Sequence, residues 1–159
     1  MNTARSISAY VLSKSEDKRL HWQKLVKLLF LIDVAACSHD LVGEGETLTG
    51  LSYLAEENGP VPSGIEELLQ GFASAGDFSR DGEYIVFTPS DDRSPNLDLN
   101  ESREMVVKQT IHRFGIASWR ELSEITHELP AWLLTERGNL IQPELLRYPY
   151  RFGRPELLS

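Results

Sequence analysis

Four histidines and one cysteine are the residues of this 159-residue chain best suited to bind a metal or to act in catalysis. His21, His39, His112 and His127 include no pair at the i, i+4 spacing that places two metal ligands on one helix face. Cys37 is two residues from His39, and side chains at that spacing on a helix point away from each other. We therefore predict no catalytic residue, no metal site and no cofactor, and we do not expect an enzyme.

Ser118 and His127 are the remaining candidates for a nucleophile and its base. The Ser-Trp-Arg-Glu sequence of residues 118–121 is, however, a capping box, in which the Ser and Glu side chains satisfy main-chain N–H groups at the start of a helix. A hydrolase or transferase that uses these histidines and Cys37 is therefore the third of three functional hypotheses.

The distribution of charge indicates the kind of partner that this chain could bind. The net charge is −8, and residues 41–104 hold fourteen acidic and three basic side chains. Such an acidic surface repels the phosphates of nucleic acids and attracts basic proteins. The longest apolar run, residues 28–36, is interrupted by Asp33, and no export signal begins the chain. We therefore expect a cytoplasmic protein with no membrane partner and no nucleic-acid partner.

Apolar periodicity predicts an α+β fold that is mainly α-helical. We expect a compact bundle of about six helices around a central buried helix over residues 20–39, with a small antiparallel sheet of two to three strands. Residues 51–55 are the expected first strand, and the Asp81-Gly82 pair predicts a hairpin that joins it in one sheet. The turn-rich residues 56–62 are expected to form a rigid corner, after which Ser63 caps the next helix.

Residues 118–138 resemble a helix-turn-helix in outline, because a capping box and Pro130 begin two successive helices. A DNA-binding transcriptional regulator that uses this segment is therefore the alternative function. Its second helix offers mainly Glu136 and Arg137 as polar groups, whereas a recognition helix uses several Arg, Lys, Asn or Gln side chains.

The last residues alternate aromatic and basic side chains with Pro and Gly. We divide the chain into one domain over residues 1–146 and an extended C-terminal tail over residues 147–159. Aromatic and arginine side chains dominate interface hot spots. Tyr148, Tyr150 and Arg151 are therefore candidate contacts for a partner protein, although such aromatic residues can also fold back over the core.

Three spaced motifs resemble the Panacea domain family, the SocA-like antitoxin domain of bacterial and phage toxin-antitoxin pairs. Residues 24–30, Lys-Leu-Val-Lys-Leu-Leu-Phe, are similar to the helix signature of the family, with Val26 where Gln is usual. Residues 49–53 and the Gly-Pro-Val-Pro sequence of residues 59–62 are similar to its strand and corner. Residues 118–127, with Pro130 and Trp132 beyond them, are similar to its closing block.

This resemblance implies an antitoxin that neutralises a cognate toxin, encoded by the adjacent gene, through direct protein contact. Some members resemble proteolytic adaptors, so delivery of the toxin to a cellular protease is an alternative to occlusion. The resemblance also implies a bacterial or prophage origin. It implies no cofactor.

The motifs lead us to expect one group of residues that contact the partner and a second group with structural roles. We expect the partner to contact Tyr53, Glu56, Glu57, Asn58 and Pro60, together with the tail residues named above. We expect structural roles for Lys24, Lys27, Gly59, Val61, Pro62, Trp119, Thr126, His127 and Trp132, with both lysines reaching from the central helix toward solvent and both tryptophans in the core.

Overall fold

The structure is a computed structural model that describes residues 3–89, 95–151 and 154–157. It contains the helices α1 (Thr3–Ser13), α2 (Trp22–Ser38), α3 (Ile65–Ser74), α4 (Glu101–Phe114), α5 (Trp119–His127) and α6 (Pro130–Leu133), and the 3-10 helices η1 (Glu16–Lys18) and η2 (Pro143–Arg147). Its strands are β1 (Arg19–His21), β2 (Tyr53–Glu56), β3 (Gly59–Pro62), β4 (Phe78–Asp81), β5 (Tyr84–Phe87), β6 (Tyr150–Arg151) and β7 (Arg154–Leu157). The predicted α+β, mainly helical fold class is confirmed.

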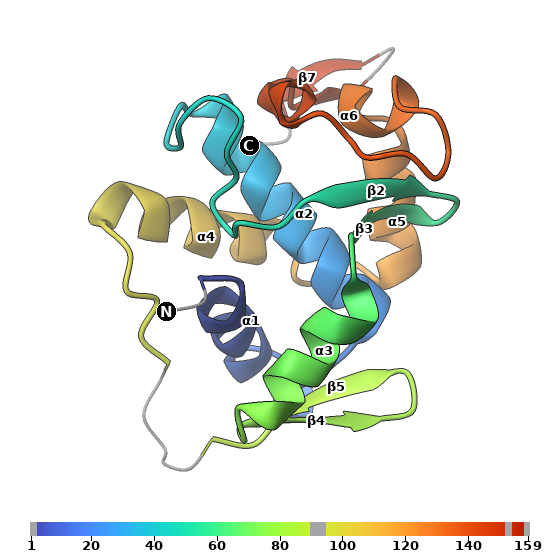
Figure 1. Ribbon diagram of the computed structural model, residues 1–159. Coiled ribbons are helices and arrows are strands. Elements are labelled where there is room, and N and C mark those ends of the chain that lie inside the picture. Colours follow the sequence, from blue (N-terminus) through green and yellow to red (C-terminus); the bar gives the residue numbers. More distant parts are fainter. Residues whose placement is uncertain (1–2, 90–94, 152–153, 158–159) are drawn as a thin grey trace.

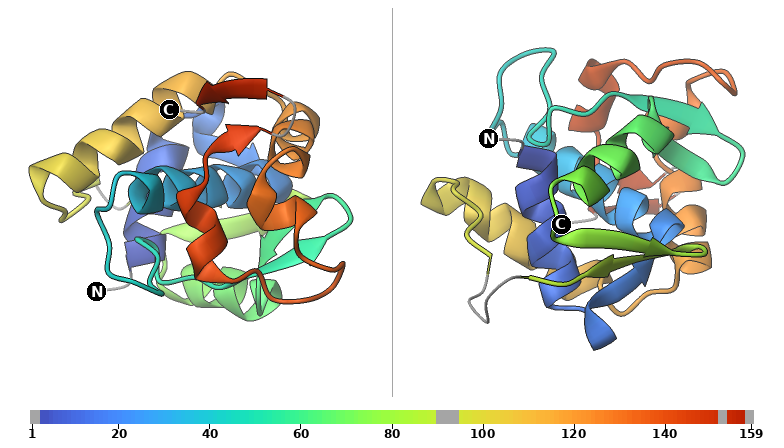
Figure 2. Two further views of the ribbon diagram at one scale, coloured as in Figure 1. Left: turned by 90° about the horizontal axis from the view of Figure 1, so that it is seen from above. Right: turned by 60° about the horizontal axis from the view of Figure 1, so that its bottom comes forward.

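Helix α2 runs through the middle of the molecule, and the other elements surround it (Figures 1 and 2). Every residue from Leu25 to Cys37 is buried. A helix that is buried on all sides carries apolar residues on all sides, which explains the near-continuous apolar sequence of residues 28–36. The prediction of a central buried helix is confirmed. No described helix is long and apolar enough to cross a membrane.

The strands pair differently from the prediction. The three-stranded sheet has the order β1-β5-β4, so its third strand is Arg19–His21 and not residues 51–55. Residues 53–56 pair instead with residues 59–62, which we predicted as a corner, and only Glu57 and Asn58 lie between these strands. Such a two-residue connection is the tightest common hairpin loop, so the local partner is favoured over a distant one.

Several helix ends test the predicted capping residues. The capping box of Ser118 and Glu121 is confirmed, and the Asn100 side chain caps α4 by accepting from the Arg103 N–H. The prediction for α3 is wrong, because Gly64, with a left-handed φ of 71°, precedes this helix and no side chain caps it. The predicted turn at Asp81-Gly82 is confirmed by the pairing of Asp81 with Tyr84 in the β4–β5 hairpin.

Candidate functional site

The three sequence motifs meet at Gly59, the first residue of β3. Gly59 has a left-handed φ of 113°, and a Cβ atom placed on it would lie 2.8 Å from Thr126 Oγ1 and 3.1 Å from Lys27 Cε. Thr126 belongs to the closing motif on α5, and Lys27 belongs to the helix motif on α2. Only glycine combines this backbone conformation with so close an approach of two side chains.

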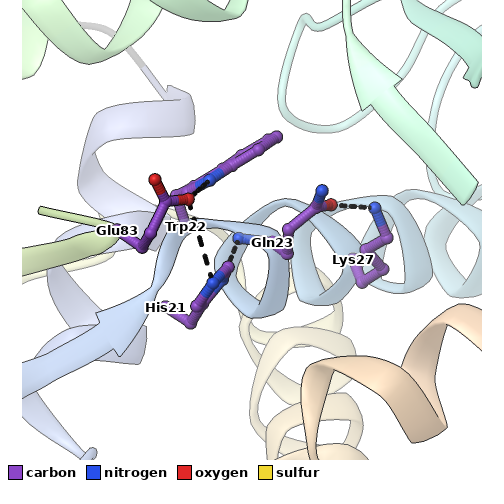
Figure 3. Close-up of polar contacts among 5 residues, drawn as sticks. All are labelled: His21, Trp22, Gln23, Lys27 and Glu83. Carbon is purple, nitrogen blue, oxygen red and sulfur yellow. Dashed lines mark hydrogen bonds and ion pairs between the residues drawn. The ribbon is translucent and has the colours of Figure 1, made fainter. Parts of the chain in front are cut away.

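Lys27 is fully buried beneath the hairpin. Its Nζ donates to Gln23 Oε1 at 2.5 Å, one turn earlier on α2 (Figure 3). Burial lowers the pKa of Lys27 to about 8, because the charged ammonium group loses its hydration. The expectation that Lys27 reaches solvent is therefore wrong, since the hairpin and α5 close over it. Lys24 is half-buried and donates to the carbonyl oxygen of Gly115 at 2.6 Å.

The main chain at the tip of the β2–β3 hairpin is held by side chains of α5 and α6. Ser123 Oγ donates to the carbonyl oxygen of Asn58 at 2.5 Å, and Trp132 Nε1 donates to the carbonyl oxygen of Glu56 at 2.7 Å. Burial is the main cause that lowers the pKa of His127, and the nearby main chain of Glu57 opposes this by raising it. We call Glu56, Glu57 and Asn58 the acidic tip; its first and last residues are thus held through their main-chain carbonyls.

Aromatic stacking supports these hydrogen bonds. The rings of His127 and Trp132 are stacked with centroids 4.0 Å apart, and the Arg137 guanidinium carbon lies 3.5 Å from the centroid of Trp132. Trp119 stacks on His21 at 5.3 Å. Both tryptophans are only partly buried, so the expectation that they fill the core is wrong; Trp132 packs against the core from its edge.

Trp132→Phe tests the contribution of the indole donor to the tip. Phenylalanine keeps an aromatic ring against His127 but leaves the carbonyl of Glu56 without its donor, which costs about 1 kcal/mol of unfolding free energy. We expect that loss in chemical denaturation, together with faster amide hydrogen exchange at residues 56–58. Unchanged exchange at these residues would show that the indole does not hold the tip.

The structure corrects the expected partner surface at two positions. Glu57 and Asn58 are exposed and Glu56 is half-buried, but Tyr53 and Pro60 are buried. The side chains of a strand alternate between its two faces, so Tyr53 and Ala55 point into the core while Leu54 and Glu56 point outward.

Tyr53 belongs to a buried polar network around Asp33 in the middle of α2. Its hydroxyl donates to Asp33 Oδ2 at 2.6 Å, and Thr49 donates to the same carboxylate through its hydroxyl at 2.6 Å and its main-chain N–H at 3.0 Å. Burial raises the pKa of Asp33 to about 6 despite these hydrogen bonds. Our sequence reasoning missed this network, although a carboxylate within an apolar helix is the signal that indicates one.

Three exposed leucines, on the two segments that contact β2 and the acidic tip, were also missed. Residues 138–141 run along β2, where Gly138 donates to Ala55 and Ile141 donates to Tyr53 through the main chain. Leu140 forms an isolated antiparallel β-bridge with Leu54. Residues paired in this way have their side chains on the same face, which here is the outer face of β2. We call Leu133, Leu134 and Leu140 the leucine rim; 41%, 63% and 53% of their surfaces are exposed.

The tail residues lie elsewhere. Tyr148 is exposed and lines a hollow with residues 42–46 and Cys37, at the C-terminal end of α2. Cys37 is ten residues beyond Lys27 on α2, which corresponds to about 15 Å along a helix. Tyr148 and the acidic tip are therefore separate surfaces. Tyr150 and Arg151 form β6, and their side chains lie outside the described part of the structure.

The geometry does not favour the two alternative functions. Cys37 is buried, and burial raises the pKa of its thiol to about 12, which opposes formation of a reactive thiolate. No group of three or more His, Cys, Asp or Glu residues among those described could hold a metal ion. Helix α6 has four residues, Pro-Ala-Trp-Leu, and is too short and too apolar to read bases in a major groove.

A family model described as "Antitoxin SocA-like, Panacea domain" matches residues 25–133. The match begins in α2 and ends with the last residue of α6, so it includes Lys27, Gly59 and the acidic tip. No curated protein and no solved structure matches the chain.

Proposed function

The chain belongs to the antitoxin SocA-like, Panacea domain family, and we propose that it is an antitoxin that neutralises its cognate toxin by direct protein binding. We further propose that the toxin is encoded by the adjacent gene and that the pair acts in the bacterial cytoplasm. Occlusion of the toxin is the proposed mode, and delivery to a cellular protease is the alternative.

The observation that carries this proposal is the fixed backbone of the acidic tip. Two side chains, Ser123 of α5 and Trp132 of α6, hold the main chain at residues 58 and 56, while the side chains of Glu57 and Asn58 are exposed. A surface that is rigid before binding loses less conformational freedom when a partner docks. The tip therefore has the rigidity that a tight interface requires.

The leucine rim supplies apolar surface next to these charges. An interface typically combines an apolar centre with a polar rim, and the charges steer the partner toward it. We therefore propose a toxin surface with apolar side chains against Leu134 and Leu140 and with basic side chains against Glu57.

The test is a growth assay in which the adjacent gene is induced alone and together with this chain. We expect toxicity alone and rescue by co-expression, with a complex that co-purifies. The proposed function fails if the adjacent gene product is not toxic. Rescue with loss of the toxin, prevented in a protease-deficient strain, would favour delivery over occlusion.

Charge reversal then locates the contact. Glu57→Lys should weaken toxin binding at least tenfold, equivalent to about 1.4 kcal/mol, because it replaces attraction by repulsion at the tip. Glu67→Lys makes the same change at an exposed position on α3 and should leave affinity unchanged. Isothermal titration calorimetry at two salt concentrations measures both. Equal affinity for wild type and Glu57→Lys would exclude the tip as the contact.

A further inference from the structure

A continuous row of aromatic rings and guanidinium groups in contact crosses the surface at the N-terminal end of α5. The Arg19 guanidinium lies 4.6 Å from the ring centroid of Tyr84, Tyr84 contacts His21 edge-on at 5.8 Å, and His21 stacks on Trp119 at 5.3 Å. The Arg120 guanidinium completes the row, 4.7 Å from the centroid of Trp119. We call these five residues the aromatic ladder.

Hydrogen bonds fix the middle of the ladder. His21 Nδ1 accepts the main-chain N–H of Gln23 at 3.1 Å, so a neutral His21 carries its proton on Nε2, which lies 4.0 Å from Glu83 Oε2 (Figure 3). Glu83 also accepts from Trp22 Nε1 at 2.7 Å. The ladder is therefore positioned by β1, β5 and the start of α5 together.

This ordered surface has the composition of an interface rather than of a solvated face. Tryptophan, tyrosine and arginine are the residues enriched in interface hot spots. The ladder together with Trp22 contains two tryptophans, two arginines and one tyrosine. Tyr84 is 42% exposed, and it lines a groove of about 1,020 Å³ together with Ile116, which is 93% exposed. Large apolar side chains at the edge of a groove favour contact with another protein.

We propose that the aromatic ladder is the interface of a symmetric homodimer. A twofold interface brings the same patch of both subunits together, so the patch must complement itself. Arg19 is already paired with Asp81 at 3.2 Å, whereas Arg120 forms no ion pair or hydrogen bond with any described residue. The side chain of Glu83 is 66% exposed. Glu83 lies beside His21, and Arg120 lies against Trp119 at the end of the row. In the proposed dimer the twofold axis passes midway between these two residues, so that Glu83 of each subunit meets Arg120 of the other.

The charge distribution favours the same face. Two chains of net charge −8 repel each other, so they associate best where the local charge is balanced. Most of the ladder comes from residues 1–40 and 105–159, whose net charges are +2 and +1, and not from the acidic residues 41–104. The acidic tip is held by Ser123, four residues or about 6 Å along α5 beyond Trp119, and by Trp132 in α6, and none of the tip residues belongs to the ladder.

Sedimentation equilibrium of the purified chain over a range of concentrations tests the proposal without any toxin. We expect a monomer–dimer equilibrium whose dissociation constant rises at least tenfold in Arg120→Glu, because each dimer loses two ion pairs and gains two like-charge contacts. Arg120→Lys keeps the positive charge and leaves Glu83 in place, so its dissociation constant should stay within a few-fold of wild type. Lys108→Glu, a matched charge reversal on α4, should not change the dissociation constant.

Ile116→Ser is a second variant that leaves the ladder and its hydrogen bonds intact. We expect it to weaken the dimer several-fold without changing the circular dichroism spectrum, because Ile116 is almost fully exposed in one subunit. A monomer at every concentration overturns the proposal. A dimer whose dissociation constant is unchanged by Arg120→Glu and Ile116→Ser also overturns it. A monomer whose affinity for the toxin falls in these variants would show that the ladder binds the toxin and not a second copy of the chain.

Discussion

Gly59→Ala is expected to lower the free energy of unfolding by about 2–4 kcal/mol. The new Cβ would lie 2.8 Å from Thr126 Oγ1 and 3.1 Å from Lys27 Cε, and forced overpacking of this kind typically costs about 1–3 kcal/mol. A left-handed backbone conformation adds about 1 kcal/mol for any residue with a Cβ. Chemical denaturation followed by circular dichroism measures the change.

Gly82→Ala is the matched control for this variant. Gly82 also has a left-handed φ, of 60°, but no atom lies within 4 Å of the position of its Cβ. Its substitution therefore tests the backbone cost alone, at a φ that residues with a Cβ adopt more easily than the 113° of Gly59, and we expect a loss of about 1 kcal/mol. Equal losses for the two variants would show that close packing against Lys27 and Thr126 is not what requires glycine at position 59.

A double-mutant cycle separates the contact from the backbone cost. Thr126→Ala removes the oxygen that the Cβ introduced by Gly59→Ala would meet, so the two substitutions together should cost less than the sum of the single losses. If Gly59→Ala also weakens toxin binding under conditions where the variant is fully folded, the result will link the position of the hairpin to the proposed function.

Asp33→Ala is expected to cost about 3–5 kcal/mol. It leaves the Tyr53 hydroxyl and both donors of Thr49 buried without an acceptor, and each stranded donor costs about 1–3 kcal/mol. Tyr53→Phe removes a single donor and leaves the carboxylate with Thr49, so it should cost about 1–3 kcal/mol. Denaturant titration at pH 7 compares them; a smaller loss for Asp33→Ala than for Tyr53→Phe would contradict the importance of this network.

The same carboxyl group predicts a pH dependence. Burial raises the pKa of Asp33 to about 6, above its value of about 3.9 in an unfolded chain, so between these values the folded protein binds the proton more tightly. Its contribution to stability is therefore greatest below about pH 4, falls as the pH rises to about 6, and is constant above that.

Asp33→Asn removes this titration and keeps the shape of the side chain. The unfolding free energy of wild type relative to Asp33→Asn should therefore fall by roughly 2 kcal/mol between pH 4 and pH 7. Taking the difference between the two proteins cancels the titration of the other groups. A difference that is independent of pH would show that Asp33 has an ordinary pKa.

Local sequence signals predicted many individual elements correctly. The capping box at Ser118, the Asn100 cap and the turn at Asp81-Gly82 each depend on residues within about four positions of one another. The family was likewise recognised from short motifs. The pairing of β1 with β5 was missed because it joins residues more than sixty positions apart, and a strand of three residues has no clear periodicity of its own.

The candidate site likewise contains residues that local signals predicted correctly and residues whose position depends on distant contacts. Glu57 and Asn58 were predicted as partner contacts as part of the turn-rich corner, and the structure shows that they are exposed. Tyr53 was misplaced because an aromatic residue in a short strand can face either side, and its direction depends on the register with β3. The leucine rim and the aromatic ladder could not be predicted, since their members come from segments that only folding brings together.

By itself, the sequence determined the family, the mainly helical fold and the ends of several helices, because helix periodicity and capping are interactions between near neighbours. The tertiary structure alone decided that Lys27 is buried beneath Gly59, that Asp33 binds Tyr53 and Thr49, and that α5 and α6 hold the acidic tip. These arrangements join residues that are up to 76 positions apart. Burial and hydrogen bonding at such separations depend on how whole elements pack, which no local pattern of residues specifies.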